Sequence, residues 1–239
     1  MVYTGVDACK TGWFAVMLGE GHDWQVAIFP DIFSLWKHCK GSKLILIDIP
    51  IGLRQGSSEK RACDEEARRL LDVRRGTSVF PVPCREVIYT DMKEASKLSE
   101  RITGKKLSKQ SLSIISKIRQ VDQLLLSDKN ARSRIRETHP ELCFWALNGG
   151  EPMVYSKRKS QGFSERLEVL LSACPYTKGL VYYAERNYLR RELARDDILD
   201  ALVAAVTASK ERQGLSFLPE KPTFDAKGLP MQMVYYSMP

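Results

Sequence analysis

The apolar positions of this chain fall into short blocks and longer helical repeats, which predicts a mixed α/β fold. The first thirty residues hold three short apolar blocks separated by turn residues, as expected for an antiparallel meander of strands. Asp31 follows and can cap a helix over 32–40, whose apolar positions recur at helical spacing. A nearly unbroken apolar block at 43–49 then predicts a central strand buried on both faces. The three strands expected before Asp31 are 2–7, 13–18 and 24–29.

Beyond residue 52 the pattern is mainly helical. The clearest amphipathic repeat covers 111–127, where Ile114, Ile118 and Val121 share one side. Gly104 is expected to end the helix that precedes it. The other expected elements are helices at 59–72, 85–101, 141–147 and 163–173, one or two helices within 185–211, a loop at 76–85, and strands at 132–139 and 230–236.

This order of elements is similar to that of the ribonuclease H-like fold. It predicts a single domain over 1–239 with a mixed five-stranded sheet flanked by helices, and a helical insertion at approximately 54–131 after the fourth strand. The hydrophobic content of 44% is enough for a sizeable core. Ligands of such sheets gather at the carboxyl ends of the strands.

Carboxylates stand at those strand ends. Asp7 closes the first strand and Asp48 closes the fourth, and the two strands are neighbours in the expected sheet. Asp197 and Asp200 open an alanine-rich helix whose small side chains allow a close approach to the sheet. Buried carboxylates are costly without a cation, so we expect a divalent metal here. A turn or helix-cap role is the simpler interpretation of each acid, and it fits Asp48 and Asp200 least well.

Two further acids surround Pro140, which ends the predicted strand at 132–139. Glu137 lies inside the strand pattern and is the better candidate for a metal ligand. Glu141 fits an ordinary acid in a first helical turn, and its role stays open. His139 could orient a ligand or contact a phosphate, although a structural histidine is the favoured interpretation.

Composition narrows the choice of metal and of compartment. The chain has three His, and its six Cys include no C-x-x-C pair, which argues against a zinc cluster. Oxygen ligands favour Mg²⁺ or Mn²⁺, and two such ions about 3.5–4 Å apart would neutralise several carboxylates. The cysteines are expected to be reduced thiols of a cytoplasmic protein. No apolar run forms a secretory leader or reaches the roughly 20 residues of a membrane span.

The net charge of +8 is unevenly distributed. Residues 101–136 hold ten Lys and Arg against two Asp, and 157–195 hold nine against four Glu, so the remainder is acidic. A basic surface around an acidic centre suits a polyanion such as a nucleic acid. A solvated helix face is the competing interpretation of either basic run.

Four stretches of the sequence resemble the domain-of-unknown-function family 429, whose members are predicted nucleases of ribonuclease H-like fold. Weaker matching segments at 79–85, 117–122 and 225–235 extend the resemblance over nearly the whole chain. An activity implied in this way rests on fold analogy. The four stretches are GVDACKTGW at 5–13, IDIPIGL at 47–53, ETHPE at 137–141 and DDILDA at 196–201.

The resemblance implies that Asp7, Asp48 and Asp200 correspond to the metal-binding acids of RuvC-type enzymes. Those enzymes keep one acid on the first strand, one on the fourth and one on the last helix. Asp197 stands where RuvC-type resolvases often have His, and Gln120 stands where Glu is common in the family.

The leading hypothesis is therefore a metal-dependent nuclease that hydrolyses DNA or RNA by a two-metal carboxylate mechanism. Asp7, Asp48, Glu137 and Asp200 would be catalytic metal ligands, and Asp197 a further ligand. A homodimer is an additional expectation, because RuvC-type enzymes pair their subunits. The candidate phosphate contacts are Lys10, Arg85, Lys109, Lys117, Arg119, Arg134, Arg136 and His139.

Two other classes of function stay open at this point. An ATP-dependent phosphotransferase of the actin-like or sugar-kinase type would share the sheet, but the chain shows no second copy of the domain and no G-x-x-x-x-G-K-[ST] loop. A catalytically silent nucleic-acid-binding or interaction module would need the basic surface without the acids.

Overall fold

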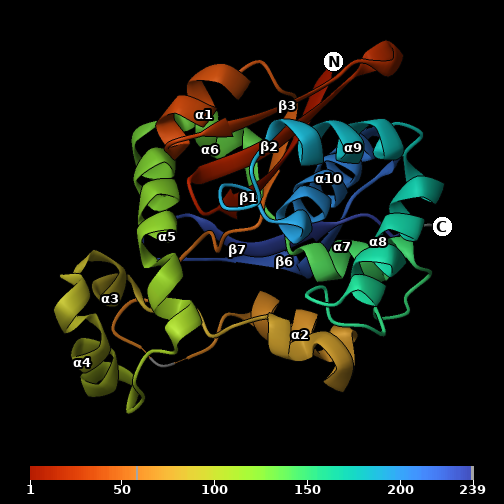
Figure 1. Ribbon diagram of the computed structural model, residues 1–239. Helices are drawn as coiled ribbons and strands as arrows, with labels where there is room; N and C mark the ends of the chain where they lie inside the picture. The colour runs from red at the N-terminus through yellow and green to blue at the C-terminus, as the bar shows by residue number, and fades with distance from the viewer. Residues whose placement is uncertain (58, 238–239) are drawn as a thin grey trace.

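The computed structural model describes residues 1–57 and 59–237, with the side chain of His22 left out. Its centre is one sheet of seven strands in the order β3-β2-β1-β4-β5-β7-β6 (Figure 1). β1, β2 and β3 form the predicted antiparallel meander, and β4, β5 and β7 continue the sheet parallel to β1. The strands are β1 (Val2–Cys9), β2 (Gly12–Gly19), β3 (Trp24–Phe29), β4 (Leu44–Ile47), β5 (Ile135–Glu137), β6 (Ser216–Phe224) and β7 (Pro230–Tyr235).

Helices cover both faces of the sheet. α1 and α5 pack on the face that carries Val6, Ile45 and Ile47, while α7 to α10 cover the opposite face (Figure 1). The helices are α1 (Ile32–Cys39), α2 (Ala62–Arg75), α3 (Arg85–Tyr89), α4 (Met92–Thr103), α5 (Lys109–Ser127), α6 (Lys129–Arg134), α7 (Pro140–Leu147), α8 (Ser160–Ala173), α9 (Thr177–Asn187) and α10 (Arg195–Ser209), with short 3₁₀ turns η1 (Glu20–His22), η2 (Gly76–Ser78) and η3 (Glu211–Gln213).

The prediction of five strands was wrong, because β6 and β7 extend the sheet beyond β5. β7 coincides with the apolar run expected at 230–236. β6 was not predicted, since it is an exposed edge strand with two prolines and few apolar residues. Such a strand lacks the alternating pattern that identifies a half-buried one.

Local capping explains the other differences from the predicted elements. The helix expected at 85–101 is two helices, because the Asp91 side chain accepts a hydrogen bond from Lys93 N–H and starts α4 anew. The strand expected from residue 132 begins only at Ile135, since Asp128 caps a helical turn before it. The predicted cap at Asp31 and the break at Gly104 are confirmed.

The stretch of sequence that connects β4 to β5 is mainly helical and contains α2 to α6. α3 and α4 extend from the body of the molecule, and α2 lies below the sheet in the view of Figure 1. None of the described helices is both long enough and apolar enough to cross a membrane.

Candidate metal centre

Asp7 and Asp48 lie on neighbouring parallel strands at the same end of the sheet. Val6 pairs with Ile47, and the Asp48 N–H donates a 3.0 Å hydrogen bond to the carbonyl oxygen of Val6. Asp7 and Asp48 are each one residue further along, so their side chains leave the sheet on the same face. Because side chains alternate, this face is the one on which Leu46 packs against α10.

The close approach of α10 to the sheet places Asp200 beside these two acids. A Cβ added at Gly5 would lie 2.1 Å from the Ala201 carbonyl oxygen and from the Ala205 nitrogen, so only glycine fits under the helix. Ile198 to Ala208 are all buried, and Asp200 itself is 1% exposed. Two turns of tightly packed small residues therefore fix the position of the Asp200 carboxylate.

The acids lie near enough to influence one another's pKa. Burial raises the pKa of Asp7 well above its ordinary value, and the neighbouring Asp48 and Asp200 raise it further. Burial likewise raises the pKa of Asp200 to about 6 and that of Asp197 to about 7. Asp197 also accepts a hydrogen bond from the Ala194 N–H, so it caps α10 as well. Each of these carboxylates therefore makes ionisation of its neighbours less favourable, and a nearby cation opposes this effect.

Lys157, in the loop before α8, forms an ion pair with Asp200, and its charge also lowers the pKa of Asp7 and Asp48. Its Nζ lies 2.5 Å from Asp200 Oδ2 and 3.9 Å from Asp196 Oδ2. Burial lowers the pKa of Lys157, but the charges of Asp200 and Asp7 raise it by more. The pKa of Lys157 is therefore raised overall. Lys157 was not predicted as a site residue, because it sits in an ordinary basic run, Lys157 to Lys159.

Glu141 and His139 complete the surroundings of the carboxylates. Glu141 Oε1 accepts a 2.5 Å hydrogen bond from the buried Arg166, while its charge acts on Asp48 and Asp200. His139 faces Asp48 and opposes the burial that raises the pKa of this acid. We call Asp7, Asp48, Asp197, Asp200 and Glu141 the acidic centre.

Three buried polar atoms at the acidic centre lack a hydrogen-bond partner among the described residues. They are Asp200 Oδ1, Glu141 Oε2 and His139 Nδ1. Unpaired buried polar atoms are rare in folded proteins because each costs the free energy of its lost hydration. Carboxylate oxygens and imidazole nitrogens are of the kinds that bind metals, but among the described residues no three side chains of the acidic centre bring their ligand atoms within 4.8 Å of one another.

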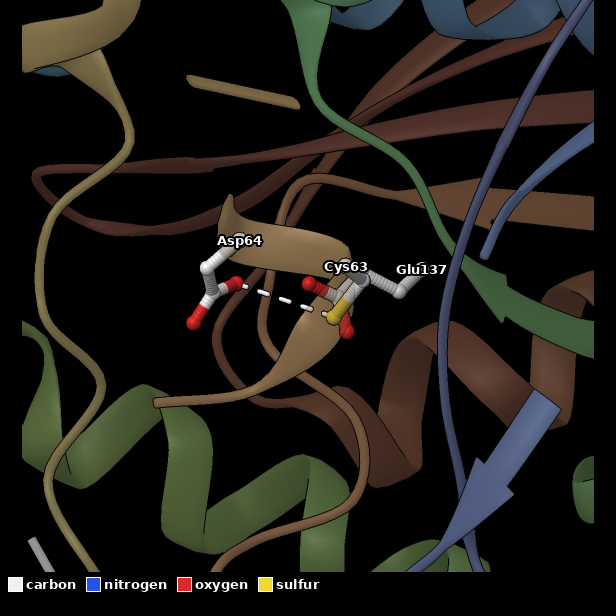
Figure 2. A group of neighbouring side chains, drawn as sticks. All are labelled: Cys63, Asp64 and Glu137. Carbon is white, nitrogen blue, oxygen red and sulfur yellow. Dashed lines mark hydrogen bonds between the residues drawn. The ribbon is translucent and has the colours of Figure 1, made fainter. Parts of the chain in front are cut away.

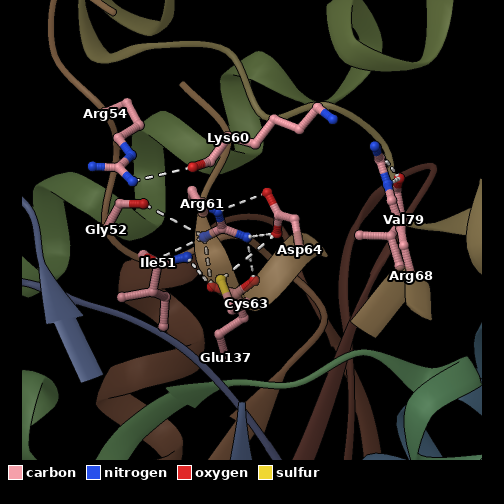
Figure 3. Close-up of polar contacts among 10 residues, drawn as sticks. All are labelled: Ile51, Gly52, Arg54, Lys60, Arg61, Cys63, Asp64, Arg68, Val79 and Glu137. Atoms are coloured by element: carbon pink, nitrogen blue, oxygen red, sulfur yellow. Dashed lines mark hydrogen bonds and ion pairs between the residues drawn. The ribbon is translucent and has the colours of Figure 1, made fainter. Parts of the chain in front are cut away.

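Glu137 does not belong to the acidic centre. It is in register with Ile47 and therefore points to the face opposite Asp48. There its two oxygens accept hydrogen bonds of 2.6 and 2.8 Å from Arg61, and Ile51 N–H donates a third at 2.7 Å (Figure 3). Burial raises the pKa of Glu137 to about 7, and Arg61 opposes that rise.

Arg61 also joins Asp64, to form what we call the Arg61 network of Arg61, Asp64 and Glu137. One ligand atom from each of Cys63, Asp64 and Glu137 lies within 4.8 Å of the others, so this group could hold a metal ion of undetermined identity (Figure 2). Arg61 already donates to both carboxylates, at 2.5 Å to Asp64 Oδ1. Burial raises the pKa of the Cys63 thiol, which disfavours the thiolate that a metal requires.

Most basic residues expected to contact phosphate are engaged within the protein. Arg85 is buried between Asp122 and Asp225. Arg119 donates to the carbonyl oxygens of Ile88 and Thr90.

Lys117 donates to the Gly12 carbonyl oxygen at 2.5 Å and lies over the Trp13 ring. Arg134 and Arg136 donate to backbone carbonyls of neighbouring segments. Lys10 and Lys109 are exposed.

Gln120, on α5, also has a structural role. Its Oε1 accepts hydrogen bonds from the Trp13 indole N–H at 3.0 Å and the Ile32 N–H at 3.1 Å. It ties α5 to β2 and to the start of α1. Its side chain therefore supports packing on the face opposite the acidic centre.

Comparison with known proteins assigns the chain to a family but does not indicate an activity. No curated protein and no solved structure matches the chain. A family model described as "Protein of unknown function (DUF429)" matches residues 5–223. This range includes Asp7, Asp48 and Asp200. The chain with this acidic centre therefore belongs to the DUF429 family.

Proposed function

We propose that this protein is a metal-dependent nuclease that hydrolyses phosphodiester bonds of DNA or RNA on a ribonuclease H-like sheet. The observation that carries the proposal is the convergence of Asp7, Asp48 and Asp200 from three separate elements, with a buried Asp200 oxygen left unpaired. The strand order β3-β2-β1-β4-β5 supports the fold assignment, with β6 and β7 as additions at one edge.

The donor set favours a hard divalent cation, Mg²⁺ or Mn²⁺. Asp7 and Asp200 would hold one ion, and Asp48 would reach a second with Glu141 in place of the expected Glu137. When bound, such ions supply a water of lowered pKa and neutralise charge on the phosphodiester.

The chain's own groups have separate tasks in this proposal. α10 holds Asp200 rigidly against β1, because Gly5 leaves no gap between helix and strand. Lys157, whose side chain is 37% exposed, neutralises Asp200 and can turn its ammonium to a phosphate oxygen. His139 presents a nitrogen without a partner beside Asp48.

The test is cleavage of labelled single-stranded, duplex, hybrid and branched DNA and RNA in Mg²⁺ and in Mn²⁺. We expect Asp48→Asn and Asp200→Asn each to lower the cleavage rate by more than about 100-fold, since each removes a charged metal ligand. The matched control is Asp23→Asn, which changes an exposed acid before β3. Undiminished cleavage by Asp48→Asn, or equal loss in the control, would contradict the proposal.

A further inference from the structure

Two neighbouring recesses open between α2, the loop that follows it and the start of α5. Their volumes are about 740 and 380 Å³, and they share Arg68, Pro81 and Ser108 as walls. Volumes of about 300–1,000 Å³ are typical of sites that hold small molecules or parts of larger ones. Together the recesses offer room for a few nucleotide units.

A small third pocket adjoins the recesses, and Arg61, Asp64 and Glu137 of the Arg61 network also line it. It has a volume of about 20 Å³, and Asp48 and His139 form part of its wall. It shares Val79 and Phe80 with the larger recess, and Arg61 with the smaller one. We call the two recesses and this pocket the α2–α5 groove. One end of the groove therefore lies at Asp48.

The groove is rich in basic side chains that come from separate segments. Arg68 and Arg69 are on α2, and Lys105 and Lys106 precede α5. Among the described residues, Arg69 and Lys105 form no ion pair, and Lys106 approaches the exposed Glu100 only to 3.9 Å. Such exposed pairs contribute little, so the charges of Arg69, Lys105 and Lys106 are available to an anionic ligand, whereas Arg68 already donates to the Val79 carbonyl oxygen. The N-terminal end of α5 opens at the same wall and adds its positive dipole.

An aromatic residue stands where the recesses meet the small pocket. Phe80 is half-buried and contributes to the walls of both the larger recess and the small pocket. A base can stack on an exposed aromatic ring whatever its identity, but a base inside a duplex has both of its faces covered. The pocket beside Asp48 is also too small for more than a single polar group.

We propose that the α2–α5 groove binds a single-stranded nucleic acid and leads its phosphodiester backbone to Asp48. This inference rests on the proposed function, because it names the class of substrate that the acidic centre would cleave. Cations along the groove contact successive phosphates, Phe80 stacks one base, and the flexible strand presents a phosphate oxygen at the narrow pocket.

Binding in EDTA tests the groove without any cleavage. Fluorescence anisotropy would measure the Kd of labelled single-stranded and duplex oligonucleotides of equal length for the full chain. We expect the single strand to bind tighter, and Lys105→Glu/Lys106→Glu to weaken it at least tenfold with a shallower salt dependence. The matched control is Lys37→Glu/Lys40→Glu, an equal charge change on exposed residues around α1, which should change Kd less than threefold.

Phe80→Leu separates stacking from packing, because leucine keeps an apolar side chain in the loop. Loss of one stacked base should weaken single-strand binding by about fivefold or more, with unchanged thermal unfolding. Tighter binding of the duplex, or equal Kd for the groove variant and its control, would overturn the inference. Groove binding without any cleavage would instead contradict the proposed nuclease and leave the groove intact.

Discussion

The acidic centre and the Arg61 network are two clusters of buried carboxylates at the same end of one sheet, and they are built differently. In the network, each oxygen of Glu137 accepts a hydrogen bond from Arg61, and the Ile51 N–H adds one more. In the acidic centre, several carboxylates raise one another's pKa and Lys157 pairs with Asp200, while Asp200 and Glu141 each keep an oxygen without a hydrogen-bond partner among the described residues. Carboxylates whose hydrogen bonds are complete hold the fold together, whereas under-neutralised ones with raised pKa values are typical of functional sites.

The largest expected effect is on the stability of the network. Arg61→Met leaves Asp64 and Glu137 buried without their cation, so we expect unfolding to become easier by about 3–5 kcal/mol. Urea unfolding monitored by circular dichroism measures this. Arg61→Met/Glu137→Gln should recover part of the loss, because it removes one of the unpaired charges. A single variant as stable as the parent would show that the network does not hold the loop after β4.

The pH dependence of stability should report on the Asp200 carboxyl when the parent is compared with a variant that lacks it. The pKa of Asp200 is raised to about 6 from about 3.9 in an unfolded chain, so the folded protein binds this proton more tightly. Its stabilising contribution is therefore complete below about pH 4 and is lost as the pH rises through about 6, by about 2–3 kcal/mol. The difference in unfolding free energy between the parent and Asp200→Asn, measured without metal from pH 4 to pH 8, gives this contribution. Saturating Mg²⁺ should flatten the difference, and a difference that grows with pH would contradict the sign.

The smallest expected effect is a gain of stability at the acidic centre. Asp7→Asn removes one of the mutually repelling carboxylates while its side-chain oxygen can still accept the hydrogen bond from Ala8 N–H. In EDTA at pH 8 we expect the variant to be more stable by about 1 kcal/mol, and to lose the stabilisation that Mg²⁺ gives the parent. Thermal unfolding with and without Mg²⁺ checks both, with Asp23→Asn as the control. Lower stability of Asp7→Asn in EDTA would show that Asp7 is a structural acid.

Much of the fold could be predicted because the signals are local. The amphipathic repeat within α5, the apolar run of β4 and the cap at Asp31 each depend on residues a few positions apart. The edge strand β6 and helix α9 were missed, and β6 is a mostly exposed strand with few apolar residues. Their place is set by pairing with β7 and by packing against β3.

The sequence by itself determined the candidate acids Asp7, Asp48 and Asp200, because a carboxylate at the end of an apolar strand or beside small helix residues stands out in one dimension. Only the tertiary structure decided that Glu137 faces Arg61, and that Lys157 joins the acidic centre. The face on which a strand side chain lies depends on the register of that strand with the adjacent strand. The ion-pair partner of a loop lysine depends on how the chain folds back on itself. The local spacing of residues predicts neither of these features, because both depend on contacts between segments far apart in the chain.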